Sequence, residues 1–276
     1  MDTGHGAGAL TAVVRAERGG KIVSLRDGAG TEWLTQSCRS QSPPPGTAFG
    51  DAEMAGWDEC APTIDRCVVR GAVLPDHGDA WDAVWTGTGA TLRHVGSSLP
   101  YRLERTIAAT PDGGLRLSYR ATTDHGSVPF LWAAHPQLAA PPGTRVEVAP
   151  APRLVVDVLA DGWPTARWSE GLAGIDGVVP GGCRKLYVHP HEHVASADLV
   201  RRDGGRLRMT FSGTIPYLGL WFDRGRYART PVIAIEPAIA YADSLARAVE
   251  LGTAPVLTPG RALEWWIELH AFPGPA

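Results

Sequence analysis

Three residues of this chain have side chains suited to acid–base chemistry, and each lies where a strand is expected to end. Glu236 follows a β-branched apolar run and precedes Pro237. Proline has no N–H and a fixed φ, so we predict that the strand stops there with the carboxylate at its rim. His77 precedes a glycine, and His135 precedes a proline. A carboxylate and two imidazoles gathered on one rigid sheet would suit proton transfer to and from a substrate.

Each of these residues also has a structural interpretation. Glu236 could be a rim carboxylate paired with an arginine, and His135 could be a hydrogen-bonded histidine of the core. His77 stands between an aspartate and a glycine, which alone would explain a turn. The sequence leaves these alternatives open.

The elements that would position these residues are short β-strands. Apolar runs alternate with Gly, Pro and Asp turn signals along the whole chain, for example at 111–114 and 203–205. No helical pattern recurs between the strands, which argues against a parallel α/β sheet. One short helix is expected at 245–251, capped by Asp243 or Ser244. We therefore predict an all-β, largely antiparallel sandwich that forms a single domain over residues 1–276.

Composition excludes several classes of function. The chain has 276 residues, 44% hydrophobic and 20% charged, which is typical of a globular protein with a large core. A net charge of −3 gives no basis for binding nucleic acid or an anionic membrane. No apolar run approaches the roughly 18 residues of a membrane span, and the first residues do not resemble a signal peptide. We expect a cytoplasmic protein whose cysteines, Cys38, Cys60, Cys67 and Cys183, are reduced and match no paired metal-binding spacing.

The order of motifs along the chain resembles the galactose mutarotase-like superfamily, in particular its bacterial aldose 1-epimerase-like members. The motifs lie at 20–25, 30–34, 56–63, 74–81, 132–136, 184–188, 218–223, 234–237 and 257–260. Each is weak alone, but the ordered set covers nearly the whole chain. Because one fold hosts many functions, the set is more specific for fold than for activity.

The resemblance implies a β-supersandwich with a cleft on a concave sheet and the activity of an aldose 1-epimerase, or mutarotase. By this resemblance, Glu236 removes the proton of the anomeric hydroxyl, His135 protonates the ring oxygen, and His77 binds the sugar nearby. Opening a hemiacetal ring requires these two transfers, for which Glu and His are the usual pair. The expected partner is a neutral aldose, no cofactor or metal is required, and the protein would be a monomer or homodimer.

Five further residues are candidates for binding the sugar. Asp58 and Glu59 are adjacent carboxylates that could accept hydrogen bonds from sugar hydroxyls, or could form a solvated turn. Trp57 and Trp132 flank the candidate motifs and could stack on a sugar, although core packing is the commoner fate of tryptophan. Asp176 roughly matches where the superfamily often places a sugar-binding aspartate, but the glycines around it could equally form a turn.

One departure from the superfamily concerns arginine. Galactose mutarotases usually carry an Asn-Arg segment in the first third of the chain, and the corresponding stretch here, 49–59, has no arginine. Lys185 or Arg39 could take its place. Two other functions therefore stay open: a different acid–base reaction on a modified or natural-product sugar, and carbohydrate binding without turnover. A sugar phosphate is not favoured, because the only tight basic pair is Arg201-Arg202.

The segment His189-Pro-His-Glu-His193 could bind a metal ion. In an extended strand its three histidines would share one face and could hold zinc. Pro190 would break strand pairing, however, so we expect a solvent-facing strand end without a physiological metal.

Overall fold

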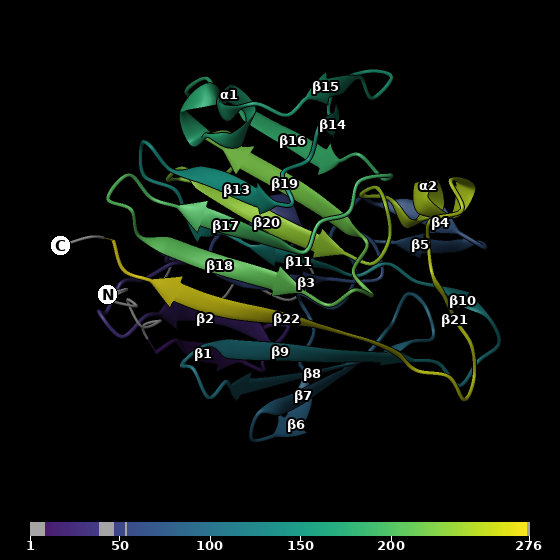
Figure 1. Cartoon of the computed structure of the whole chain (residues 1–276). Helices are drawn as coiled ribbons and strands as arrows, with labels where there is room; N and C mark the ends of the chain where they lie inside the picture. The colour runs from purple at the N-terminus through teal and green to yellow at the C-terminus, as the bar shows by residue number, and fades with distance from the viewer. Residues whose placement is uncertain (1–8, 39–46, 53, 275–276) are drawn as a thin grey trace.

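Two large antiparallel sheets make up most of the protein. The structure, a computed structural model, describes residues 9–38, 47–52 and 54–274. One sheet has ten strands and the other has eight, and neighbouring strands run antiparallel. Figure 1 shows the two sheets layered against each other. The all-β prediction is confirmed.

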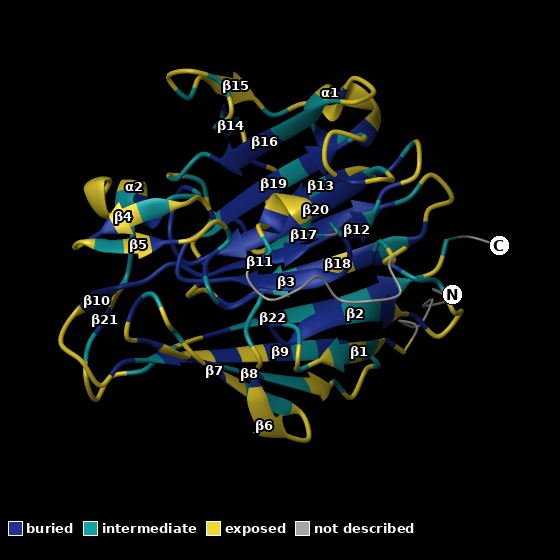
Figure 2. Ribbon diagram, turned by 180° about the vertical axis from the view of Figure 1, so that it is seen from behind, coloured by how far each residue is buried: buried dark blue, intermediate teal, exposed yellow. Residues whose placement is uncertain are grey.

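The ten-stranded sheet carries the candidate site. Its order is β1 (Thr11–Arg15), β2 (Lys21–Arg26), β3 (Trp57–Cys60), β11 (Ala133–Pro136), β20 (Val232–Ala238), β19 (Tyr217–Asp223), β16 (Cys183–Val188), β14 (Leu154–Asp157) and β15 (Thr165–Arg167), with β12 (Leu138–Ala139) also paired to β20. The central strands of this sheet are buried along most of their length (Figure 2).

The eight-stranded sheet covers the other side of the core. Its order is β13 (Arg145–Ala149), β17 (Ser196–Val200), β18 (Arg206–Phe211), β22 (Leu263–Phe272), β9 (Leu115–Thr122), β8 (Arg102–Ala109), β7 (Thr91–Val95) and β6 (Thr86–Thr88). Two small ribbons complete the strands: β4 (Cys67–Val69) with β5 (Ala72–Leu74), and β10 (Val128–Pro129) with β21 (Val256–Leu257).

Helices are few and short in the described part of the chain. The predicted helix is confirmed as α2 (Leu245–Glu250), and its cap is Ser244, whose hydroxyl accepts a hydrogen bond from the Arg247 N–H at 3.3 Å. A second helix, α1 (Glu170–Ala173), was not expected, because a single turn shows no periodicity in sequence. The 3₁₀ turns are η1 (Phe49–Asp51) and η2 (Ile175–Gly177). None of these helices is long and apolar enough to cross a membrane.

Pro237 does not end its strand, so the predicted rim position of Glu236 is wrong. β20 continues to Ala238 and is a central strand, paired with β19 along its whole length. On its other side, β11 pairs with β20 only at Ala238, and β12 pairs with it only at Val232 and Ile233. Proline is tolerated because this side has no ladder hydrogen bond to lose. The carboxylate therefore projects from the middle of the sheet.

Candidate functional site

Strand register places polar side chains from four central strands on one face of the ten-stranded sheet. His135 on β11 lies opposite Asp58 on β3, and Lys185 on β16 lies opposite Trp221 on β19. Glu236 lies opposite Gly219, which offers no side chain to cover it. Because directly paired residues share a face and residues two apart repeat it, this face carries His135, Glu236 and Lys185.

The Glu236 carboxylate is fully buried, and only one of its two oxygens accepts a hydrogen bond. The Lys185 ammonium donates to Oε2 of Glu236 and also lies 3.2 Å from the carboxylate of Asp243. No described residue donates a hydrogen bond to Oε1. Burial raises the pKa of Glu236, and the Lys185 charge opposes that rise. Oε1 is therefore an unused acceptor on a carboxylate whose pKa is moved toward neutrality, as a general base requires.

His135 lies beside this open oxygen. Its Nε2 is 3.9 Å from Oε1 of Glu236, which is too long for a hydrogen bond. Burial, together with the charges of His77 and Lys185, lowers the pKa of His135 well below its usual value, so the ring is neutral at pH 7. The Gln137 amide nitrogen lies near both ring nitrogens of His135, and in the shorter of the two contacts it donates to Nδ1 at 3.1 Å. A neutral ring that accepts at Nδ1 carries its proton on Nε2, which lies nearest Glu236.

His77 reaches the same place from a turn. Its φ of +58° is left-handed, and a Cβ on the following Gly78 would lie 1.9 Å from the Ala61 carbonyl oxygen, so only glycine fits there. The His77 ring stacks on Phe49 at 3.5 Å and meets the His135 ring edge-on at 5.2 Å. The turn interpretation and the site interpretation are thus compatible, since the turn is what presents the imidazole.

His77, His135 and Lys185 border a cavity of about 250 Å³ that opens to solvent, and the buried Glu236 lies against His135 and Lys185. Two histidines, one lysine, three aspartates and a tryptophan are among its lining residues: His77, His135, Lys185, Asp65, Asp76, Asp243 and Trp221. Burial, and then the nearby Asp243, raises the pKa of Asp65. The indole N–H of Trp221 is buried and finds no acceptor among the described residues. The wall therefore combines hydrogen-bond acceptors, an apolar ring and an unused donor.

Comparisons with known proteins identify the fold. A scan against models of protein families finds no match, and a search of curated proteins finds no relative. Solved structures do match. The Slr1438 protein of Synechocystis sp. PCC 6803 superimposes with a TM-score of 0.75 at 16% identity, over 96% of this chain and 93% of that one. A proposed aldose 1-epimerase from Escherichia coli K12 superimposes with a TM-score of 0.71 at 17% identity, over 96% of this chain and 97% of that one. A galactose mutarotase-like protein from Clostridium acetobutylicum superimposes with a TM-score of 0.68 at 13% identity, over 97% of this chain and 94% of that one.

This chain has the galactose mutarotase-like fold. The superfamily resemblance drawn from the order of motifs is confirmed at the level of fold. At these identities the fold alone is shown, and the chemistry must be argued from the residues of this chain.

Within this mutarotase-like fold, Glu59 lies on the opposite face from its neighbour Asp58. Its side chain is fully buried between the sheets, where Arg105 donates to Oε1 at 2.7 Å, Tyr119 to Oε1 at 3.0 Å and Trp132 to Oε2 at 2.8 Å. Both oxygens are occupied, so the expectation that Glu59 binds sugar is corrected: it neutralises a buried arginine.

The two tryptophan candidates are also corrected. Trp132 packs against the rings of Tyr119 and Trp265 at 4.5 and 5.0 Å, inside the core. Trp57 is fully buried and, like Glu59, faces the eight-stranded sheet. The tryptophan that lines the cavity is instead Trp221. It lies on β19 directly opposite Lys185 and therefore shares its face of the sheet.

Asp58 is on the site face, but it does not line the cavity. Lys21 donates to its Oδ2 at 2.8 Å, and its Oδ1 is buried without a partner among the described residues. Directly across from it on β11 is His135. Asp58 is therefore a cross-strand neighbour of the histidine, and its carboxylate is held by Lys21.

Asp176 and the histidine run lie elsewhere. The carboxylate of Asp176 accepts the Gly143 N–H at 2.7 Å in the turn η2, which is the structural alternative stated above. His189, His191 and His193 do not form a strand, because β16 ends at Val188 and a turn follows. Of the two substitutes for the missing arginine, Lys185 is at the site, and Arg39 lies outside the described residues.

Four site residues were not found from sequence. Asp65, Asp76 and Asp243 line the cavity, and Tyr187 donates to Asp243 at 2.7 Å. Asp243 was noticed only as a possible helix cap. A usable signal for Tyr187 existed, since it follows Lys185 by two positions on one strand and therefore shares its face.

Proposed function

We propose that this protein is a cofactor-free sugar epimerase that interconverts the α and β anomers of a neutral aldose. The observation that carries the proposal is the open Oε1 of Glu236, 3.9 Å from Nε2 of His135 beside a solvent-connected cavity. The gap is too long for a direct hydrogen bond, so Oε1 keeps its capacity to accept a proton from a substrate hydroxyl.

The reaction would proceed by two matched proton transfers. Glu236 takes the proton of the anomeric hydroxyl through Oε1, while His135 gives a proton to the ring oxygen and the C1–O5 bond breaks. The C1 carbonyl then rotates, O5 attacks its other face, and both protons return to their origins. Lys185 keeps Glu236 ionised and fixes its orientation through Oε2.

The reactive form must hold a second proton on His135. Because burial lowers the pKa of His135, the imidazolium is a minor species at neutral pH and a strong acid when it forms. The ionised carboxylate of Glu236, 3.9 Å away, is the charge that favours it.

The charges on the wall favour a neutral sugar. Three aspartates face the cavity, and its one lysine is already paired with two carboxylates. A phosphate or carboxylate group would be repelled and would find no arginine fork. Sugar hydroxyls, by contrast, donate to carboxylates and accept from the Trp221 indole. The cavity, about 250 Å³, is smaller than the roughly 300–1,000 Å³ of drug-sized ligand sites, which suits a monosaccharide.

The test is anomer exchange on a panel of neutral aldoses, followed by NMR after subtraction of the uncatalysed rate. We expect Glu236→Gln and His135→Asn each to lower kcat by roughly 10²–10⁴-fold, the usual contribution of a general acid or base. Asp176→Asn is the matched control and should be unchanged. Wild-type rates in Glu236→Gln would exclude the mechanism. A protein that binds sugars without exchanging anomers would support the binding alternative, and turnover of only a modified sugar would support the other acid–base reaction.

A further inference from the structure

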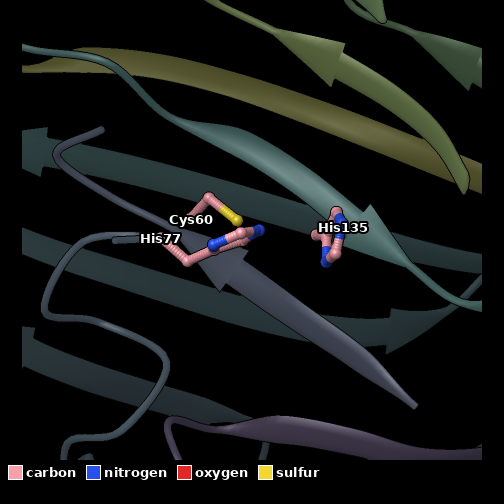
Figure 3. A group of neighbouring side chains, drawn as sticks. All are labelled: Cys60, His77 and His135. Atoms are coloured by element: carbon pink, nitrogen blue, oxygen red, sulfur yellow. The ribbon is translucent and has the colours of Figure 1, made fainter. Parts of the chain in front are cut away.

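Cys60, His77 and His135 form a compact group of metal-ligating side chains. One ligand atom from each, a sulfur and two ring nitrogens, lies within 4.8 Å of the other two. Figure 3 shows the three side chains on separate segments, with the thiol of Cys60 at the end of β3 beside the His77 ring and His135 set to one side. No other such group of three is found in the described part of the chain.

The surroundings of this group are those of a coordination site. His77 and His135 line the cavity, so a fourth position on a bound ion would face solvent and could take water. Nδ1 of His77 lies 3.0 Å from the Asp76 carboxylate, which orients the ring and leaves Nε2 as the available ligand atom. A carboxylate behind a ligating histidine is the usual outer support of a metal site.

The distances require only a small closure. Around a tetrahedral zinc ion with bonds of about 2.0–2.3 Å, ligand atoms lie about 3.5 Å apart. The His77 ring sits on a half-buried turn, whereas the other two ligands are on strands of the central sheet. His77 is therefore the ligand that can move by the roughly 1 Å needed.

We propose that Cys60, His77 and His135 bind a thiophilic divalent cation of the zinc class, with water in the fourth position. Binding forms one metal–sulfur and two metal–nitrogen bonds and releases the Cys60 thiol proton to solvent through the cavity. The His135 proton moves from Nε2 to Nδ1, where the Gln137 amide accepts it after turning to present its unpartnered oxygen. A second part of the inference rests on the proposed function. The bound ion inhibits sugar turnover, because it occupies the ring nitrogens that the reaction and the sugar would use.

The test is Co²⁺ titration of tag-free, reduced, metal-free protein, followed by absorption. Wild type should bind one equivalent and show a thiolate-to-cobalt charge-transfer band with visible bands of tetrahedral intensity. Cys60→Ser should lose the charge-transfer band. His77→Asn should weaken Co²⁺ binding by more than about tenfold. Asparagine also tolerates the left-handed backbone at position 77, so this variant should fold if Cys60→Ser does not.

Cys183→Ser is the matched control, since Cys183 is a partly buried thiol on the same sheet, and it should leave the spectrum unchanged. The run from His189 to His193 contains no sulfur and cannot contribute the charge-transfer band. A band that persists in Cys60→Ser, or the absence of any band in wild type, would overturn the site.

Inhibition is measured separately. One equivalent of Zn²⁺ should abolish anomer exchange in wild type, EDTA should restore it, and the cysteine variant should resist zinc. Zinc that binds without slowing exchange would overturn the inhibitory role. If metal-free wild type exchanges no anomers while the cobalt spectrum appears as described, the proposed function fails and the metal site stands.

Discussion

Replacing Lys185 by methionine should change the pH dependence of the proposed anomer exchange. Methionine keeps the length of the side chain but removes the charge that contacts Oε2 of Glu236 and lies 3.2 Å from Asp243. The buried carboxylate of Glu236 and the partly buried carboxylate of Asp243 would then face each other without that cation. Burial already raises the pKa of Glu236, and Lys185 is the largest opposing influence, so its removal moves that pKa further upward.

The size of the effect follows from the contact. An opposite charge within about 4–6 Å shifts a carboxyl pKa by roughly 1–3 units, and each unit is about 1.4 kcal/mol. Below the pKa of a general base the rate falls tenfold per pH unit, so a rise of about 2 units lowers kcat/KM by about 100-fold on the acidic side. At high pH the rate of every variant should fall again, because His135 must hold a second proton to act as the acid.

The assay is the pH profile of anomer exchange for wild type, Lys185→Met and Lys185→Arg. The arginine variant retains the charge, and its acidic limb should stay within about half a unit of wild type. Urea unfolding of each variant checks that the fold is intact. An acidic limb that does not move in folded Lys185→Met, or that moves equally in Lys185→Arg, would refute the assignment of Glu236 as a base tuned by Lys185.

Three further predictions concern single residues. Glu59→Gln should destabilise folding by about 3–5 kcal/mol in urea unfolding, because it leaves the buried charge of Arg105 unpaired, while KM stays constant. Burial alone would raise the pKa of Asp79, but hydrogen bonds from His94, Ser98 and Tyr101 lower it from 3.8 to about 2. Asp79 therefore adds about 2 kcal/mol of stability above pH 4 that is lost as pH falls through 2, and unfolding curves of Asp79→Asn and wild type should converge there. Trp221→Ala should raise KM for the sugar by up to about tenfold with a smaller change in kcat.

The fold could be predicted because its signals are local. Turn residues, short apolar runs and the capped segment before Gly252 specify strands and one helix without any knowledge of their neighbours. The errors arose where pairing decides the outcome. Pro237 predicts the end of a strand, yet β20 accommodates it because β11 does not pair with β20 at that position.

Only part of the candidate site could be predicted from sequence, again because strand pairing decides which side chains come together. Glu236, His135 and His77 lie near one another, as their residue types, their expected strand-end positions and the order of motifs predicted. Asp58 and Glu59 do not act together, because adjacent residues of a strand point to opposite faces. The aspartates of the cavity come from loops, where no periodicity links one position to another.

The alternation along β3 also has an evolutionary consequence. Positions 58 and 60 face the cavity side, whereas 57 and 59 face the interior and a buried arginine. One four-residue strand is thus under two separate kinds of selection. Among descendants of this chain, substitutions at 58 and 60 should follow changes of substrate or metal exposure. Substitutions at 59 should instead covary with position 105 on β8 and be indifferent to the ligand.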